Sequence, residues 1–165
     1  MQTFDFKDGN GPVPAHRHSN PDGTLGGWVA DTATVEPMCY VGENARVYGD
    51  AQVFEDAQVY GNARVYENAC VFEDAQIYDN ARVFGHAHVC GDALVCGNAK
   101  VLGRASVFEY ARISGSAQVY GNARVLERAQ VYGNARVSGN ALVRGDNILT
   151  EGSHTLVLEN YEIYE

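Results

Sequence analysis

The chain has 165 residues, of which 45% are hydrophobic and 20% charged, a composition typical of one globular domain. Its formal net charge of −9 disfavours nucleic acid and anionic membranes as partners of the whole molecule. No apolar run approaches the roughly 20 residues of a membrane span, and the first residues lack a signal-peptide pattern. We therefore expect a cytoplasmic protein, with no membrane partner, whose four cysteines are reduced.

Residues 1–26 are the irregular part of the sequence, and we expect them to form an N-terminal cap made of a short strand and a loop. Phe4 and Phe6 alternate as in a strand, and a stretch rich in Gly and Pro follows. That stretch carries His16, Arg17 and His18, two imidazoles around a guanidinium. Such a group is suited to binding an anion or, with a third ligand, a metal. The alternative is that these side chains only hydrogen-bond to nearby backbone.

Residues 27–146 repeat in sixes. From Ala45 to Asp146 there are 17 uninterrupted hexads, in which the first residue is always Ala and the third is Val or Ile. Side chains alternate along extended backbone, so these two face a core and the second and fourth face outward. The fifth residue is Gly in eleven hexads and Glu or Asp in the others, which suits a tight corner with positive φ. The pattern predicts an all-β solenoid of stacked parallel strands.

Residues 147–165 leave this rhythm. The alternation from His154 to Tyr164 predicts a C-terminal strand that caps the last coil, because an uncovered coil is an open sheet edge.

The motif V-x-G-N-A-x, as in Val59 to Arg64, resembles the bacterial transferase hexapeptide superfamily of left-handed β-helices. The chain resembles uncharacterised bacterial and phage-borne members of this superfamily that are without the acyltransferase loop. The resemblance implies a left-handed, triangular coil of three hexads, or 18 residues, and assembly as a parallel homotrimer. In the superfamily Gly usually follows the aliphatic residue directly, whereas here an aromatic residue often stands between them.

Folding the hexads at 18 residues sorts the outward side chains into three faces. One of them, which we call the apolar column, carries Phe54, Phe72, Cys90, Phe108 and Leu126. An exposed apolar stripe of this length indicates a surface covered by another subunit. The alternative is an exposed ladder of stacked rings.

A second face, the basic face, carries Arg46, Arg64 and Arg82 next to Tyr48 and Tyr66. Guanidinium groups bind phosphates and carboxylates, and the rings offer a surface for stacking on a planar ligand. The alternative is a solvated face that Glu67 or Asp50 neutralises from the corners. The acidic corners are also open to two readings, as sites for hard cations or as turn formers.

His86 and His88 are the histidine pair within the hexads, and Cys90 follows them. The resemblance to carbonic anhydrases of the superfamily implies three zinc-binding histidines across an interface, and no third ligand is identifiable here. The alternative for His88 is a buried interface histidine. Acyltransferases of the superfamily need a catalytic histidine and a loop that leaves the coil, and the hexads contain no such loop.

These observations favour a non-catalytic, homo-oligomeric scaffold that binds a small anionic ligand in clefts between subunits and needs no cofactor. Two alternatives stay open. One is a phage-type protein that sequesters a nucleotide-like signal, and the other is an acyltransferase or a carbonic-anhydrase-like enzyme.

Overall fold

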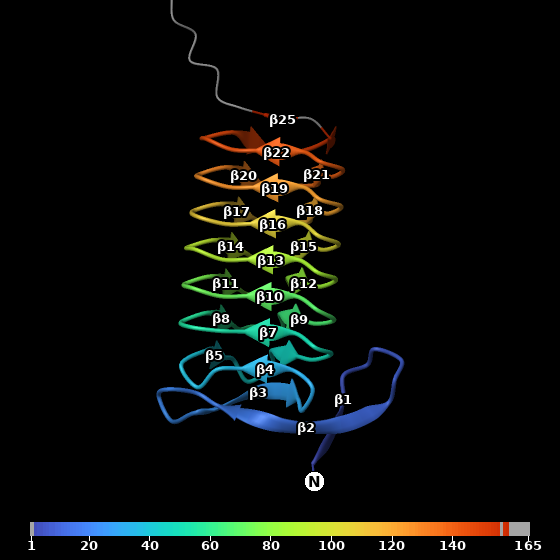
Figure 1. Ribbon diagram of the computed structural model, residues 1–165, viewed down its shortest axis with the longest axis vertical. Helices are drawn as coiled ribbons and strands as arrows, with labels where there is room; N and C mark the ends of the chain where they lie inside the picture. Colours follow the sequence, from blue (N-terminus) through green and yellow to red (C-terminus); the bar gives the residue numbers. More distant parts are fainter. Residues whose placement is uncertain (1, 156, 159–165) are drawn as a thin grey trace, which may run out of the picture.

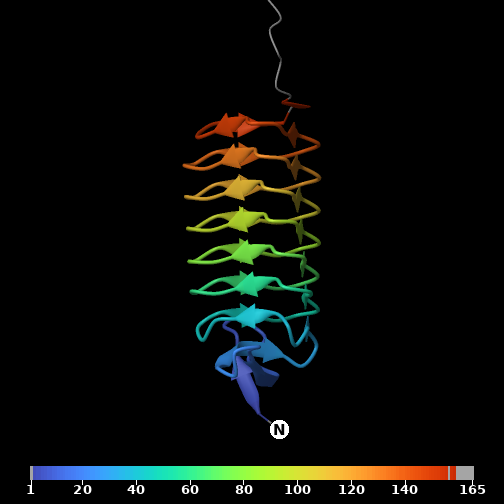
Figure 2. The same cartoon turned by 90° about the vertical axis from the view of Figure 1, so that its left-hand side faces the viewer.

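The computed structural model describes residues 2–155 and 157–158, and every regular element among them is a β-strand. None of the described residues belongs to a helix that could cross a membrane. Coils are stacked along the long axis of the molecule, with the N-terminal strands at one end (Figures 1 and 2). Each coil adds one short strand to each of three sheets, and stacked residues such as Arg46 and Arg64 are 18 positions apart. The predicted all-β parallel solenoid is confirmed.

Among the described residues, the largest sheet has ten strands and carries the basic face. In spatial order its strands are β1 (Thr3–Asp5), β2 (Pro12–Ser19), β3 (Leu25–Ala30), β6 (Arg46–Val47), β9 (Arg64–Val65), β12 (Arg82–Val83), β15 (Lys100–Val101), β18 (Gln118–Val119), β21 (Arg136–Val137) and β24 (Ser153–His154).

The second sheet has eight strands in the part of the chain that the structure describes, and it carries the apolar column. Its strands are β4 (Thr34–Val35), β7 (Gln52–Val53), β10 (Cys70–Val71), β13 (His88–Val89), β16 (Ser106–Val107), β19 (Arg124–Val125), β22 (Leu142–Val143) and β25 (Val157–Leu158). The third sheet has seven strands, namely β5 (Tyr40–Val41), β8 (Gln58–Val59), β11 (Gln76–Ile77), β14 (Leu94–Val95), β17 (Arg112–Ile113), β20 (Gln130–Val131) and β23 (Ile148–Leu149). The three predicted faces are therefore the outer surfaces of these sheets.

The core is a continuous prism of small apolar side chains. From Ala45 to Val143, the first and third residues of every hexad are completely buried. Each buried pair lies on the pair one coil away, because strict sixes keep all coils in register. Burial of this apolar surface is the main stabilising contribution to such a solenoid.

The corners explain the mixture of Gly and acidic residues at the fifth position. That residue has a φ between 58° and 74° in all 17 hexads, which Gly adopts without steric cost. An L residue in this conformation costs roughly 1–2 kcal/mol. At Glu67 the side chain offsets part of this cost, since its carboxylate accepts a hydrogen bond of 2.8 Å from the backbone N–H of Gly85, one coil later. Glu55, Glu73, Asp79 and Glu127 make the equivalent bond. The turn-forming reading of the acidic corners therefore holds for these residues, whose carboxylates bind backbone.

The N-terminal end closes the solenoid with antiparallel strands. Strand β2 pairs with β1 on one side and β3 on the other, and it crosses beneath the first coil (Figure 1). The expected loop around His16 is thus wrong, because these residues form β2. Phe6 is 1% exposed and packs with Ala15, Ala30 and Tyr48 in a second apolar cluster.

Parallel pairing starts at β3, where Trp28 lies opposite Arg46, in line with the expected start of the repeat region at residue 27. It continues beyond Asp146 through β23, β24 and β25. In its described part, the segment expected as a C-terminal cap strand thus continues the coil in short parallel strands. Residues 156 and 159–165 of that segment lie outside the described residues. The domain boundaries after residues 26 and 146 stay predictions.

Candidate anion site on the basic face

Four consecutive positions of one column on the basic face are cationic. Strand pairing places Arg46, Arg64, Arg82 and Lys100 directly in register on β6, β9, β12 and β15. Neighbouring strands in a sheet are about 4.8 Å apart, so adjacent guanidinium groups of the column can reach one ligand together.

An aromatic ladder lies beside this column. The rings of Tyr48 and Tyr66 are parallel, with centroids 4.9 Å apart and an interplanar angle of 2°. Phe6 covers the other face of Tyr48 at 4.7 Å, and Phe84 covers the other face of Tyr66 at 4.7 Å. Both faces of both tyrosine rings are therefore occupied. The expectation that these rings stack on a planar ligand is wrong, and only their edges and hydroxyl groups are available.

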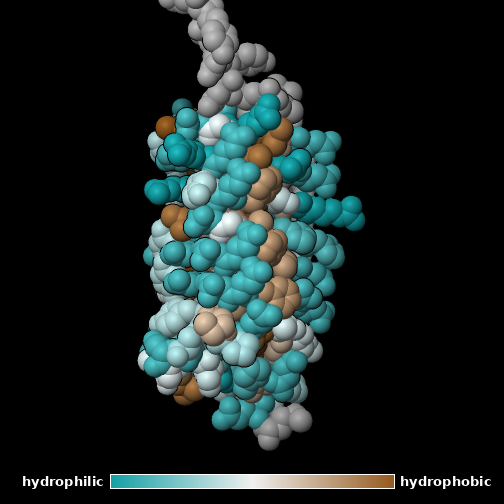
Figure 3. All heavy atoms as spheres, turned by 60° about the vertical axis from the view of Figure 1, so that its left-hand side comes forward, coloured by the Kyte–Doolittle hydropathy of each residue, from teal (hydrophilic) through white to brown (hydrophobic). Residues whose placement is uncertain are grey.

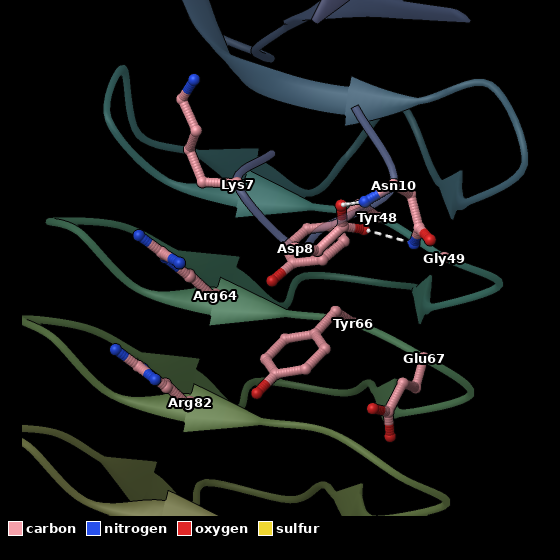
Figure 4. A pocket seen from close by; sticks show the side chains of 9 residues that line it. All are labelled: Lys7, Asp8, Asn10, Tyr48, Gly49, Arg64, Tyr66, Glu67 and Arg82. Atoms are coloured by element: carbon pink, nitrogen blue, oxygen red, sulfur yellow. Dashed lines mark hydrogen bonds between the residues drawn. The ribbon is translucent and has the colours of Figure 1, made fainter. Parts of the chain in front are cut away.

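A cavity of about 370 Å³ lies between the basic column and the N-terminal arm. The sheet and its corners contribute Tyr48, Gly49, Arg64, Tyr66, Glu67 and Arg82, and the arm contributes Lys7, Asp8 and Asn10. In Figure 4 the guanidinium groups of Arg64 and Arg82 lie on the side of the rings to which both tyrosine hydroxyls point. Glu67 lies on the opposite side of the rings (Figure 4). The cavity thus presents two cations and two hydroxyls on one side.

The carboxylates that line the cavity are engaged elsewhere. Glu67 accepts its hydrogen bond from Gly85, and Asp8 accepts bonds of 3.0 and 3.1 Å from the backbone and side-chain nitrogens of Asn10. Within the described residues, neither Arg64 nor Arg82 forms an ion pair. The neutralisation by Glu67 or Asp50 that the sequence left open is therefore not observed there.

The two phenols are protonated hydrogen-bond donors at neutral pH. Burial raises the pKa of Tyr48, and the positive charge of Arg64 opposes the rise. Burial also raises the pKa of Tyr66, where the neighbouring Tyr48 adds to the rise and Arg82 opposes it. A raised phenol pKa keeps the hydroxyl neutral above its ordinary value near 10, so both groups can donate to an anion.

Arg46 contacts the N-terminal arm and does not line the cavity between Arg64 and Arg82 and that arm. Its guanidinium lies over the ring of Phe4, 5.2 Å from the centroid, and donates a 3.4 Å hydrogen bond to the carbonyl of Phe6. With Arg17, Phe4 and Trp28 it lines a smaller, separate cavity of about 250 Å³.

The structure does not gather His16, Arg17 and His18 into one site. The exposed His16 ring contacts the carboxylate of Asp31 at 2.9 Å. Arg17 lies over Trp28 and donates to the carbonyl of Gly26. The buried His18 ring bonds to the carbonyl of Cys39 at 2.9 Å. For Arg17 and His18 the backbone-bonding alternative describes what is observed.

Sequence reasoning missed Lys7, Asp8 and Asn10 as part of the cavity. The Asp8-Gly9-Asn10-Gly11 segment signals a turn, and Phe4 and Phe6 signal a strand before it. No pattern in the sequence indicated that this turn lies against Tyr48, more than thirty residues later.

Four segments of the chain, residues 57–72, 75–91, 117–127 and 129–145, match the family described as the YdcK beta solenoid repeat. The matched segments lie within the stacked hexads of all three sheets. The chain is a β-solenoid repeat protein. No curated protein matches it.

The apolar column of this β-solenoid follows the strands of the eight-stranded sheet. Phe54, Phe72, Cys90, Phe108 and Leu126 each come directly after a strand of that sheet, and each is half-buried. Figure 3 shows an apolar stripe that runs along the solenoid between hydrophilic bands. Coverage of the column by a second subunit stays a prediction.

His86 and His88 are both exposed side chains on this side of the β-solenoid. Within the described residues, no three His, Cys, Asp or Glu side chains are grouped so that they could hold a metal ion. The neighbouring Cys90 has a pKa raised to about 11, first by burial and then by the charges of Glu73 and other neighbours. A nucleophilic thiol needs the opposite shift.

Proposed function

We propose that this β-solenoid is a non-catalytic binding protein that holds a small anion in the cavity of the basic face. The observation that carries the proposal is the pair of guanidinium groups of Arg64 and Arg82. They lie one coil apart, without an ion pair among the described residues, next to two phenol donors. Buried or partly desolvated charge-assisted hydrogen bonds are the strong ones, so an anion gains most where such donors converge.

The proposal includes a homo-oligomer, with the apolar column as its interface and the trimer of the hexapeptide-repeat superfamily as its form. It also includes the left-handed coil that the resemblance to that superfamily implies. The corner after β9, which begins with Glu67, joins the basic face to the eight-stranded sheet. A subunit that covers the eight-stranded sheet therefore meets the basic face at this corner, on the Glu67 side of the cavity and opposite Arg64 and Arg82.

The protonated thiol of Cys90 favours a binding function over a reaction in which this thiol is the nucleophile. Its raised pKa keeps the thiol protonated at neutral pH, so it is a poor nucleophile. The hydroxyls of Tyr48 and Tyr66 are likewise suited to donate hydrogen bonds and not to remove protons.

The test is a thermal-shift screen of the purified full-length protein with phosphate, sulfate, nucleotides and dicarboxylates. A ligand at a hundredfold its Kd stabilises the folded state by about 2.7 kcal/mol, which is easily detected. We expect stabilisation by at least one anion, reduced by added salt and abolished in Arg64→Ala/Arg82→Ala. The matched control is Arg112→Ala, which removes an exposed arginine from the seven-stranded sheet and should leave binding unchanged. A panel without any hit, or a hit that the double variant retains, overturns the proposal.

A further inference from the structure

We infer that the cavity of the basic face selects a tetrahedral dianion, a phosphate or sulfate group, and recognises it without contacts to the organic part of the ligand. This inference rests on the proposed function and names the ligand class of that same site. It follows from which donors the cavity offers, how they are spaced, and which ring surfaces are closed.

Both faces of the Tyr48 ring and of the Tyr66 ring are closed to a ligand. A nucleobase or other planar group gains affinity by stacking on an aromatic face. Tyr48 lies between Phe6 and Tyr66, and Tyr66 lies between Tyr48 and Phe84, all at centroid distances from 4.7 to 4.9 Å. Tyr48 is consequently only 6% exposed. No face of either ring is left for a planar ligand, so the aromatic ladder provides hydroxyl donors and no stacking platform.

The charges of Arg64 and Arg82 favour a dianion as the ligand. Arg64 and Arg82 are in direct register, so two like charges lie one strand apart, and an anion between them offsets their repulsion. Asp8 is held by Asn10, Glu67 lies on the far side of the rings and is bonded to Gly85, and Lys7 is paired with Asp5 at 2.7 Å. Asp8 and Glu67 keep their negative charges, but among the described residues neither is paired with Arg64 or Arg82, so both guanidinium groups can contact one anion. Two adjacent cations attract a dianion more strongly than a monoanion.

The number of hydrogen-bond donors at the cavity favours a ligand with more than two acceptor oxygens. Two guanidinium forks and two phenol hydroxyls reach the same side of the rings (Figure 4). A tetrahedral group with three or four acceptor oxygens can receive bonds from all of them, whereas the two oxygens of a single carboxylate point in one plane. The donors thus favour phosphate or sulfate over acetate-like ligands.

The experiment is isothermal titration calorimetry of the full-length protein with six probes. These are inorganic phosphate, sulfate, acetate, AMP, UMP and adenosine. We expect phosphate, sulfate and both nucleotides to bind with Kd values within about threefold of one another, and acetate and adenosine to bind at least tenfold more weakly. Tyr66→Phe keeps the aromatic ladder and removes one hydroxyl, so it should weaken binding of phosphate about three- to tenfold. Phe84→Leu, which shortens the ladder beyond Tyr66 and removes no donor, is the control and should change the affinity less.

The outcomes separate this inference from the proposed function. If AMP binds at least tenfold more tightly than phosphate, or differs from UMP to that extent, the ligand is recognised by its base. The inference then fails while anion binding stands. If acetate and sulfate bind with the same Kd, the cavity does not select a dianion, and the inference fails while anion binding stands. If none of the six probes binds, the inference fails, and the proposed function falls with it only if the dicarboxylates of the thermal-shift screen also give no stabilisation.

Discussion

The carboxylate of Glu73 accepts a 2.5 Å hydrogen bond from the backbone N–H of Gly91, which occupies the same corner one coil later. Glu73 has a φ of 60°, a conformation that is costly for any residue with a Cβ atom. The bond gives an N–H group at the corner a partner, so the side chain that creates the strain also compensates for it.

This relationship predicts that Ala is worse than Gly at position 73. Glu73→Ala removes the hydrogen bond and keeps the strained φ, so we expect the free energy of unfolding to fall by about 1–2 kcal/mol. Glu73→Gly removes the bond and relieves the strain, so its loss should be smaller by about 1 kcal/mol. Urea denaturation measures both values, and hydrogen exchange of the Gly91 amide should accelerate in both variants. Equal stability of the two variants with unchanged exchange at Gly91 would contradict this account.

Oligomerisation through the apolar column predicts a loss of assembly when charges enter it. Phe72→Glu combined with Phe108→Glu places four carboxyl groups in a dimeric contact and six in a trimeric one, where they repel and are costly to bury. We expect light scattering to show an oligomer for the wild type and monomers or aggregates for the variant. Gln58→Glu with Gln130→Glu makes the same change in charge on the seven-stranded sheet and should leave the mass unchanged. A monomeric wild type would refute the interface.

The raised pKa of Cys90 predicts slow alkylation that depends steeply on pH. At pH 8 a pKa of about 11 leaves roughly a hundredfold less thiolate than the ordinary value of 9.0 does. Iodoacetamide should therefore modify Cys90 about a hundredfold more slowly in the folded protein than in urea, and about tenfold faster for each pH unit up to about 11. Mass spectrometry of the peptide that contains Cys90 gives both rates.

The raised pKa of Cys90 also makes the free energy of unfolding depend on pH. Because folding raises the pKa, it favours the protonated thiol, so its stabilising contribution is complete below pH 9 and disappears between pH 9 and about 11. Cys90→Ser should lose this part of the pH dependence. Rapid alkylation of the folded protein at pH 8 would show instead that Cys90 is an activated thiol and would reopen the enzyme alternative.

The strict hexads determined most of the architecture. A period of six with Ala and Val at fixed positions decides which residues are buried, as Ala63 and Val65 illustrate. Three hexads per coil decide which outward residues are stacked, and this is why the register of Arg64 on Arg82 could be read from the sequence. Both relationships repeat along the chain, and repetition is what makes a contact between residues 18 positions apart visible in a single sequence.

Contacts made by non-repeating residues were decided only by the tertiary structure. Phe6 binds the N-terminal arm to Tyr48, which places the turn around Asp8 at the cavity and closes the ring face that the sequence left open for a ligand. His18 reaches the carbonyl of Cys39 because β2 crosses beneath the first coil, which removes the ring from any anion site. Such contacts join one irregular segment to one place on a regular surface. Their geometry depends on packing against the folded solenoid, and no period in the sequence encodes it.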